Sequence, residues 1–184
     1  MNRELYLCSL LMLAVFAGMI WYLADYVSSN QEALFNNSYN SQQRVLAQEN
    51  TRGTIYAGTG EVLAQTVIAE DGTSVREYPY KNIFAHVVGY TDKGKTGIEE
   101  LENYQLIHSD ISDREKLDHE LAGEKNPGND VYTTLDTSLQ QAASDALGLY
   151  RGAIVVTEVK TGRVLAMVSK PDYDPNKIAE NWET

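Results

Sequence analysis

The stretch VYTTLDTSLQQAASDALGLYRGAIVVTEVKTGRVLAMVSK (residues 131–170) contains, in order, the signals of a strand, a helix and a hairpin. Val131–Leu135 is rich in β-branched and aromatic residues, which predicts a short strand. Asp136 or Thr137 can cap the helix that follows, because a side-chain oxygen there accepts from a free N–H of the first turn. Apolar residues then recur at helical spacing as far as Leu147, and Gly148 suits the end of the helix.

The hairpin consists of two apolar runs, residues 153–159 and 164–168, joined by a turn in which Gly162 can supply a positive φ. Two strands alone are marginally stable, so we expect this hairpin to dock on the helix over 137–147. The same order of strand, glycine-rich turn and strand occurs earlier, over residues 51–64. Two occurrences of different length do not make a repeat architecture, which needs a sustained period.

Between the two hairpins the sequence predicts further local elements. Residues 67–80 alternate irregularly around a turn at Asp71-Gly72. The apolar run Ile83–Val88 is interpreted as a strand that ends in a polar loop over 89–97. A helix is expected from Ile98 onward, because glutamates stand near its amino end, where the helix dipole favours negative charge. Residues 109–130 are read as an exposed connection with a short helix around 115–121.

A membrane-spanning helix is predicted close to the amino terminus. Residues 5–24 form an apolar run without a single charge, and at about 1.5 Å per residue this run spans roughly 30 Å of hydrocarbon. No small-residue cleavage site follows, so we interpret it as an uncleaved anchor. Trp21, Tyr22 and Tyr26 gather at its far end and Arg3 precedes it, which favours a cytoplasmic amino terminus and an exported remainder. Residues 26–50 fit a loose helix or an extended stalk.

Composition excludes several classes of function. The 15 Lys and Arg against 26 Asp and Glu give a net charge of 15 − 26 = −11, which argues against nucleic-acid binding. The single cysteine, Cys8, excludes an intramolecular disulfide and a cysteine-based zinc site. His86, His108 and His119 have no metal-ligand spacing, so no metal and no cofactor is expected.

A phosphate-loop pattern occurs at Gly89–Thr96, GYTDKGKT. Such a loop binds phosphates through its backbone amides and its lysine, and an acidic strand completes the metal site. Glu158, at the end of the run 154–158, would be the matching acid. Because the predicted anchor places this loop where nucleoside triphosphates are scarce, nucleotide binding is the weakest of the functional hypotheses.

No serine nucleophile is recognisable. The chain has no Gly-x-Ser-x-Gly, and no serine is followed by a lysine three residues later. The chain also contains two Lys-Thr-Gly and two Ser-x-Asn triplets. They are not preceded by a serine nucleophile, so we interpret them as structural. They are 95–97, 160–162, 28–30 and 38–40.

Taken together, several motifs and their order resemble a class B penicillin-binding protein. The segments that carry the resemblance are Arg52-Gly53-Thr54-Ile55, residues 60–64, 78–80 with 88–90, Gly97-Ile98-Glu99, 131–143 and 152–176. The resemblance covers nearly the whole chain, and residues 131–176 are its most specific part. One departure stands at Tyr56–Gly60, where the family commonly has an Asp-Arg-Asn/Asp-Gly turn and this chain keeps only the closing glycine.

The resemblance implies an α+β architecture with one transmembrane helix. Its expected parts are an anchor (1–25), a juxtamembrane stalk (26–50), a mixed α+β pedestal or dimerisation domain (51–135) and the first β-hairpin of a penicillin-recognising transpeptidase domain (136–184). The family cross-links peptidoglycan through a serine acyl-enzyme. Its Ser-x-x-Lys, Ser-x-Asn and Lys-Thr-Gly motifs normally lie downstream of Thr184, so no catalytic, cofactor-binding or metal-binding residue is assigned to this chain.

By the same resemblance, the chain anchors and positions the catalytic domain in the bacterial cell membrane. The implied partners are the lipid bilayer, a membrane-embedded glycan polymerase, other cell-wall synthesis proteins and peptidoglycan. The alternative hypothesis is a membrane-tethered extracytoplasmic interaction module that has no enzyme attached.

Overall fold

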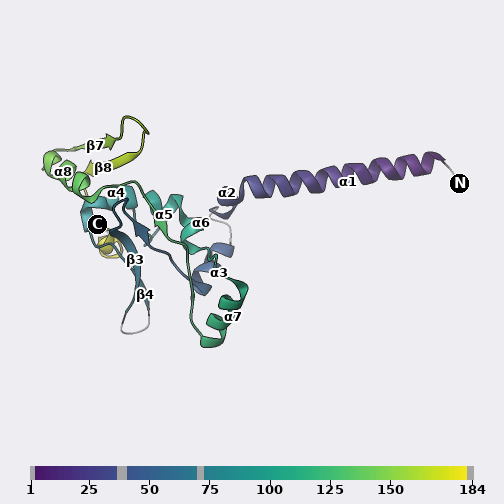
Figure 1. Cartoon of the computed structure of the whole chain (residues 1–184), viewed down its shortest axis with the longest axis horizontal. Coiled ribbons are helices and arrows are strands. Elements are labelled where there is room, and N and C mark those ends of the chain that lie inside the picture. Colours follow the sequence, from purple (N-terminus) through teal and green to yellow (C-terminus); the bar gives the residue numbers. More distant parts are fainter. Residues whose placement is uncertain (1–2, 37–40, 70–72, 182–184) are drawn as a thin grey trace. The chain divides into compact units, whose positions relative to one another are not determined.

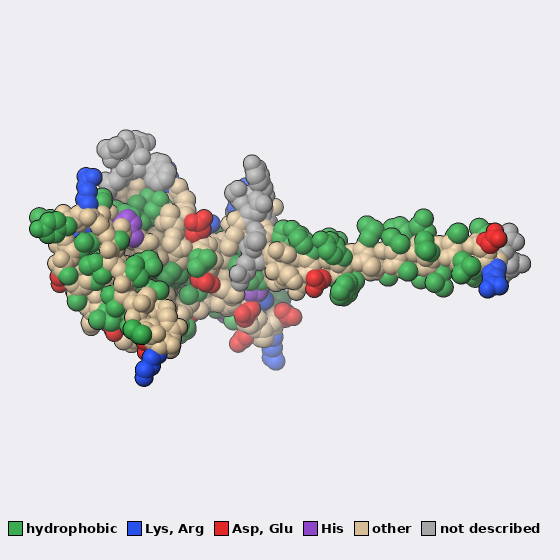
Figure 2. Space-filling view, turned by 90° about the horizontal axis from the view of Figure 1, so that it is seen from above, with side chains coloured by type: hydrophobic (Ala, Val, Ile, Leu, Met, Phe, Trp, Pro, Cys, Tyr) green, Lys and Arg blue, Asp and Glu red, His purple; other side chains and the backbone are tan. Residues whose placement is uncertain are grey.

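The computed structural model describes residues 3–36, 41–69 and 73–181, and its contacts divide the chain into two compact units, residues 1–41 and 42–184. In the first unit, helix α1 (Arg3–Ser29) is followed by the short helix α2 (Gln31–Phe35). No residue of α1 is buried, and hydrophobic side chains line both edges of the helix in Figure 2. The prediction of an apolar helix over 5–24 is confirmed, and α1 is long and apolar enough to cross a membrane.

The second unit begins with a helix rather than an extended stalk. Helix α3 (Gln42–Glu49) leads directly into strand β1 (Asn50–Thr51), which pairs in parallel with β5 (Asn126–Pro127). With the end of α1 and with α2, most described residues in the range 26–50 are therefore helical.

A four-stranded sheet forms the centre of this unit, in the order β4 (Ser74–Glu77), β3 (Val62–Ile68), β2 (Ile55–Tyr56) and β6 (Val131–Tyr132). The β2–β3 pair is antiparallel and confirms the first predicted hairpin, although β2 is only two residues long. The β2–β6 pair is parallel and brings the predicted strand at 131 to the edge of the sheet.

Helices pack beside this sheet. They are η1 (Lys81–Phe84), α4 (Ala85–Val88), α5 (Gly97–Leu101) and α6 (Asn103–Ile107). Helix α7 (Asp113–Ala122) follows them and has no buried residue. The helices expected near 98 and 115 are confirmed. The interpretation of 83–88 as a strand is wrong: Phe84 and Val88 are both buried, and their spacing of four residues matches one face of a helix. A short apolar run does not distinguish the two structures.

The stretch from residue 131 folds as its sequence predicts. Helix α8 (Thr137–Leu147) is capped by Asp136, whose Oδ1 accepts from the Leu139 N–H at 2.9 Å. Strands β7 (Gly152–Thr157) and β8 (Val164–Lys170) form the second hairpin, with Gly162 at φ +74°. The hairpin docks on α8, as Figure 1 shows. The short helices η2 (Pro175–Lys177) and α9 (Ile178–Asn181) follow.

Three of the predicted features lie outside the described residues. They are the turn at Asp71-Gly72, the Ser-x-Asn triplet at 38–40 and residues 182–184. The hydrophobic core of the second unit gathers residues from the sheet, the helices and the segment before α8. Its buried members are Ile55, Ala57, Leu63, Ala64, Tyr78, Phe84, Val88, Leu106 and Leu135.

Candidate functional site

A buried cluster of charged side chains joins the sheet to the first turn of α5. Glu99 is fully buried, with 0% of its surface exposed. Its Oε2 accepts from Arg52 Nε at 2.6 Å, and its Oε1 accepts from Arg76 Nε at 2.8 Å. Arg52 stands between β1 and β2, and Arg76 lies on β4, so one carboxylate connects three elements that are distant in sequence.

Further hydrogen bonds complete this cluster. Arg52 Nη2 donates to the Glu99 carbonyl at 2.6 Å, and Arg52 Nη1 donates to Asn103 Oδ1 at 2.8 Å. Arg76 Nη1 donates to the Gly53 carbonyl at 2.7 Å. The Tyr78 hydroxyl donates to Glu99 Oε1 at 3.3 Å, and burial, with the Glu99 charge as a second cause, raises the pKa of this phenol. Buried charges are tolerated when they are paired and hydrogen-bonded in this way.

Two glycines allow the backbone to approach closely around the cluster. A Cβ on Gly53 would lie 2.0 Å from the Asn129 carbonyl oxygen, which no side chain can occupy. Gly97 has φ +62°, and a Cβ there would lie 2.6 Å from the Val87 carbonyl oxygen. These contacts give a physical reason for the glycines of the Arg52-Gly53 and Gly97-Ile98-Glu99 motifs.

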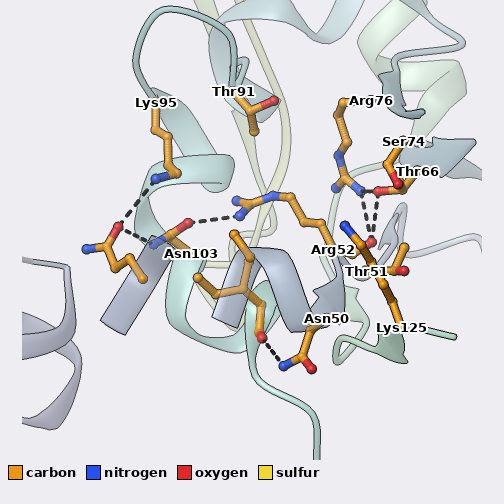
Figure 3. Close-up of a pocket in the computed structure, with 13 residues that line it drawn as sticks. Asn50, Thr51, Arg52, Thr66, Ser74, Arg76, Thr91, Lys95, Asn103 and Lys125 are labelled. Atoms are coloured by element: carbon orange, nitrogen blue, oxygen red, sulfur yellow. Dashed lines mark hydrogen bonds between the residues drawn. The ribbon is translucent and has the colours of Figure 1, made fainter. Parts of the chain in front are cut away.

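A cavity of about 240 Å³ lies beside the cluster (Figure 3). Arg52 and Arg76 line it, together with Lys95 and Lys125. Lys95 Nζ donates to Gln43 Oε1 of α3 at 3.4 Å. Desolvation by burial and, after it, the nearby Arg52 charge lower the pKa of Lys95, against the weaker effect of Glu99 and Glu100. The side of the cluster that faces this cavity is therefore cationic.

The structure contradicts the phosphate-loop hypothesis. The pattern Gly89–Thr96 follows helix α4 instead of a strand, so the strand–loop–helix context that the motif requires is missing. Glu158 follows β7 at the hairpin turn, where it accepts from Arg163 Nε at 3.0 Å and from the Thr161 hydroxyl. It is thus engaged within its own hairpin.

A second set of contacts fastens the first sheet and its helices to the α8–β8 region. Gln140 of α8 is fully buried, and its side-chain amide both donates a hydrogen bond to the backbone of β8 and accepts one from it. Its Nε2 donates to the Met167 carbonyl at 2.9 Å, and its Oε1 accepts from the Met167 N–H at 2.8 Å. The same Nε2 also donates to the Ile83 carbonyl of η1 at 2.8 Å. One amide therefore holds α8, β8 and η1 together.

Asn176 likewise donates one hydrogen bond to the backbone of Tyr78, the residue after β4, and accepts another from it. Its Oδ1 accepts from the Tyr78 N–H at 2.9 Å, and its Nδ2 donates to the Tyr78 carbonyl at 3.0 Å. Nearby, the Tyr173 hydroxyl donates to the Ala85 carbonyl at 2.9 Å. Here and below, "the junction" means this set of contacts made by Gln140, Tyr173 and Asn176.

The triplets and histidines singled out in the sequence do not form a second site. Lys95 lines the cavity, but Lys160-Thr161-Gly162 lies at the β7–β8 turn and Ser28-Ser29-Asn30 lies at the end of α1. Across the described ranges, no group of three or more His, Cys, Asp or Glu side chains could hold a metal ion.

Comparison with known proteins identifies the family. The family model of the penicillin binding protein A dimerisation domain matches residues 52–131, and that of the penicillin binding protein transpeptidase domain matches residues 152–184. The chain belongs to the penicillin-binding proteins, and within them to class B. The Arg–Glu–Arg cluster lies within the first matched segment, and the junction links that segment to α8 and to the second matched segment.

Individual relatives agree with this family. The peptidoglycan D,D-transpeptidase PbpA of Mycolicibacterium smegmatis is 41% identical over 150 residues, which are 74% of this chain and 30% of the relative. The D,D-transpeptidase domain of a peptidoglycan glycosyltransferase from Eggerthella lenta is 40% identical with a TM-score of 0.60, over 73% of this chain and 29% of that one. PBPA from Mycobacterium tuberculosis is 34% identical with a TM-score of 0.63, over 73% and 34%. The chain spans about 30% of the length of the first of these relatives.

The sequence predicts Glu99 near the amino end of a helix but does not predict its ion pairs with Arg52 and Arg76. The charge of a glutamate in the first turn of a helix is ordinarily solvated, and nothing local in the sequence shows that Arg52 and Arg76 meet it. Gln140 and Asn176 were also missed, because their partners are backbone groups, which carry no sequence signal. The one available signal was that Arg52, Glu99 and Gln140 all stand in the motifs that carry the family resemblance.

Proposed function

We propose that this chain is the N-terminal portion of a peptidoglycan D,D-transpeptidase, in which it anchors the enzyme and positions its transpeptidase domain. The junction is the observation that carries this proposal. Gln140 and Asn176 tie the dimerisation-domain segment to the region that leads into the transpeptidase segment through backbone hydrogen bonds. A rigid connection of this kind lets one segment fix the orientation of the other.

The proposed division of the chain follows from this role. Residues 1–25 are the membrane anchor, 26–50 the juxtamembrane segment, 51–135 the pedestal domain and 136–184 the start of the transpeptidase domain. The amino terminus is cytoplasmic and the remainder extracytoplasmic, which the position of Arg3 before the apolar run supports. The partners are cell-wall synthesis proteins, among them a membrane-embedded glycan polymerase that contacts α1 and the pedestal, together with peptidoglycan.

Labelling with a fluorescent penicillin tests the enzymatic part of the proposal. The 184-residue chain is expected to remain unlabelled, because none of its serines has a lysine three residues later to accept the proton. A chain extended downstream along its natural reading frame is expected to be labelled covalently. An extended chain that stays unlabelled would contradict the proposal and favour the membrane-tethered interaction module.

The positioning role has its own test in the extended chain. Gln140→Leu removes the amide that holds α8, β8 and η1, and it is expected to slow penicillin labelling at a fixed concentration. Gln141→Leu is the matched control, since Gln141 is an exposed neighbour whose side chain, among the described residues, bonds to Asp145 of its own helix alone. Equal labelling rates for both variants would show that the junction does not position the catalytic domain.

Topology is tested with a reporter enzyme that is active only outside the cytoplasm, fused after residue 184. Activity is expected. Signal only from a cytosol-specific reporter at the same position would contradict the proposed orientation.

A further inference from the structure

The cavity beside the Arg–Glu–Arg cluster gathers positive charge in a chain whose net charge is −11. Four of its lining residues are Arg52, Arg76, Lys95 and Lys125, and no Asp or Glu is among the described residues that line it. Glu99 lies behind the two arginines and is bonded to both. Subtracting its charge leaves 4 − 1 = 3 positive charges around one small space.

The positive charges of this cavity are incompletely compensated. No carboxylate of a described residue lies within 4.0 Å of the Lys95 or the Lys125 ammonium. Arg76 has only 7% of its side chain exposed, and its Nη2 is buried with no hydrogen-bond partner among the described residues. Since an uncompensated buried charge is costly, an anion in the cavity would lower the free energy of this arrangement.

The remaining lining groups are also suited to an anion. The hydroxyls of Thr51 and Ser74 also line the cavity (Figure 3). The Thr66 hydroxyl lines it as well but is already engaged, since it donates to the Arg52 carbonyl at 2.9 Å. Hydroxyl, guanidinium and ammonium donors together match carboxylate and phosphate oxygens. A cation is excluded by repulsion, and an apolar ligand would leave these donors without partners.

The size of the cavity limits the ligand. Cavities that enclose drug-sized molecules usually measure about 300–1,000 Å³. At about 240 Å³, this cavity has room for one oxyanion group with a few attached atoms.

From these observations we infer that the cavity bounded by α3, β1, β4, α6 and the loop 89–96 is a binding site for a small oxyanion, a phosphate or a carboxylate. Arg52 and Arg76 form its charged wall. Lys95, which also donates to Gln43, and the exposed Lys125 add two ammonium donors. This inference rests on the cavity alone and does not depend on the proposed transpeptidase role.

Calorimetric titration of the 184-residue chain in phosphatidylcholine nanodiscs tests the site. Inorganic phosphate and succinate are titrated separately at constant ionic strength, with chloride as the replaced anion. Saturable binding with one site per chain is expected for at least one of them, and it should weaken as chloride is added. Tighter binding of phosphate assigns a phosphate ligand, and tighter binding of succinate assigns a carboxylate ligand. Absence of saturable binding of both anions overturns the inference.

Charge-neutral variants locate the binding. Lys95→Gln and Lys125→Gln are each expected to weaken the association constant by about threefold to tenfold, because each removes one charged donor. Lys160→Gln is the matched control, since it removes the same charge from the β7–β8 turn, which does not line the cavity. An equal loss in Lys160→Gln would mean that the binding is nonspecific and would overturn the inference. Circular dichroism verifies folding, and the exposed Lys125 keeps the test valid should Lys95→Gln fold poorly.

Discussion

The Arg–Glu–Arg cluster and the junction connect distant parts of the same unit with different chemistry. The cluster uses three ionised side chains that recognise one another, Arg52, Glu99 and Arg76. The junction uses the neutral side chains of Gln140, Tyr173 and Asn176, which bond to the backbone of other segments. A charge cluster depends on the identity of every member. An amide that binds backbone places no demand on the side chain of its partner, so the two regions should respond differently to substitution.

The largest effect is expected for Glu99→Gln. This nearly isosteric change leaves two buried guanidinium groups without their counter-charge, and removing one partner of a buried ion pair costs about 3–5 kcal/mol. The free energy of unfolding is measured by urea titration, followed by circular dichroism of the chain in detergent micelles. Glu100→Gln, at the exposed neighbouring position, is the control and should change stability by less than about 0.5 kcal/mol. Similar values for both variants would contradict the importance of the buried charge.

Gln140→Leu should have the next largest effect. Leucine fills a similar volume but leaves the Met167 N–H and the carbonyls of Met167 and Ile83 without their partner, at a cost of about 2–4 kcal/mol. Gln141→Leu is again the control. Hydrogen exchange gives a local reading: the Met167 amide should exchange faster in Gln140→Leu and at the wild-type rate in Gln141→Leu. Unchanged protection of Met167 would show that this amide is held by other contacts.

Asn176→Ala removes hydrogen bonds to the backbone N–H and the backbone carbonyl of Tyr78 and is expected to destabilise by about 1–2 kcal/mol. The loss is moderate because Asn176 is itself exposed. Asn176→Asp sharpens this prediction. Aspartate keeps the acceptor for the Tyr78 N–H but lacks the donor for the Tyr78 carbonyl, so its unfolding free energy should fall between those of wild type and Asn176→Ala. The same urea titration measures all three chains. A neutral outcome for Asn176→Ala would leave Gln140 as the main contact of the junction.

The smallest effect concerns pH. Burial raises the pKa of the Tyr173 phenol above its ordinary value of 10.0, so the folded state favours the protonated form that donates to the Ala85 carbonyl. This contribution is fully present below pH 10 and is lost as the pH rises through the raised pKa. Tyr173→Phe should therefore reduce the loss of stability that occurs as the pH rises above 10. Identical pH profiles for both chains would exclude Tyr173 as the responsible group.

Local signals in the sequence were sufficient for most secondary structure. The cap at Asp136, the helical spacing up to Leu147 and the glycine turn at Gly162 act within a few residues, and each is observed as expected. The error at 83–88 has a physical reason. A short apolar run satisfies both a strand and a buried helical turn, and only packing around Phe84 and Val88 decides between them.

The cavity and the two regions compared above could not be predicted in the same way. Arg52 and Glu99 are 47 residues apart, and Tyr78 and Asn176 are 98 residues apart, so neither contact produces a local pattern. Lys95 was noticed for a different reason, a phosphate-loop pattern whose surrounding structure is absent. The same lysine nevertheless lines a cationic cavity, which residues of α3 and α6 also line. Its place there follows from this packing of the loop 89–96, and the phosphate-loop motif does not explain it.

The amide of Gln140 has a consequence for solubility. Strand β8 pairs with β7 on one side, and on its other side Gln140 bonds to the N–H and carbonyl of Met167 while the Asp136 N–H donates to the Leu165 carbonyl. A free strand edge is a template on which a strand from another molecule can add, and this is a common route to aggregation. In this chain helix α8 and its cap occupy that edge, so loss of Gln140 is expected to promote intermolecular association as well as unfolding.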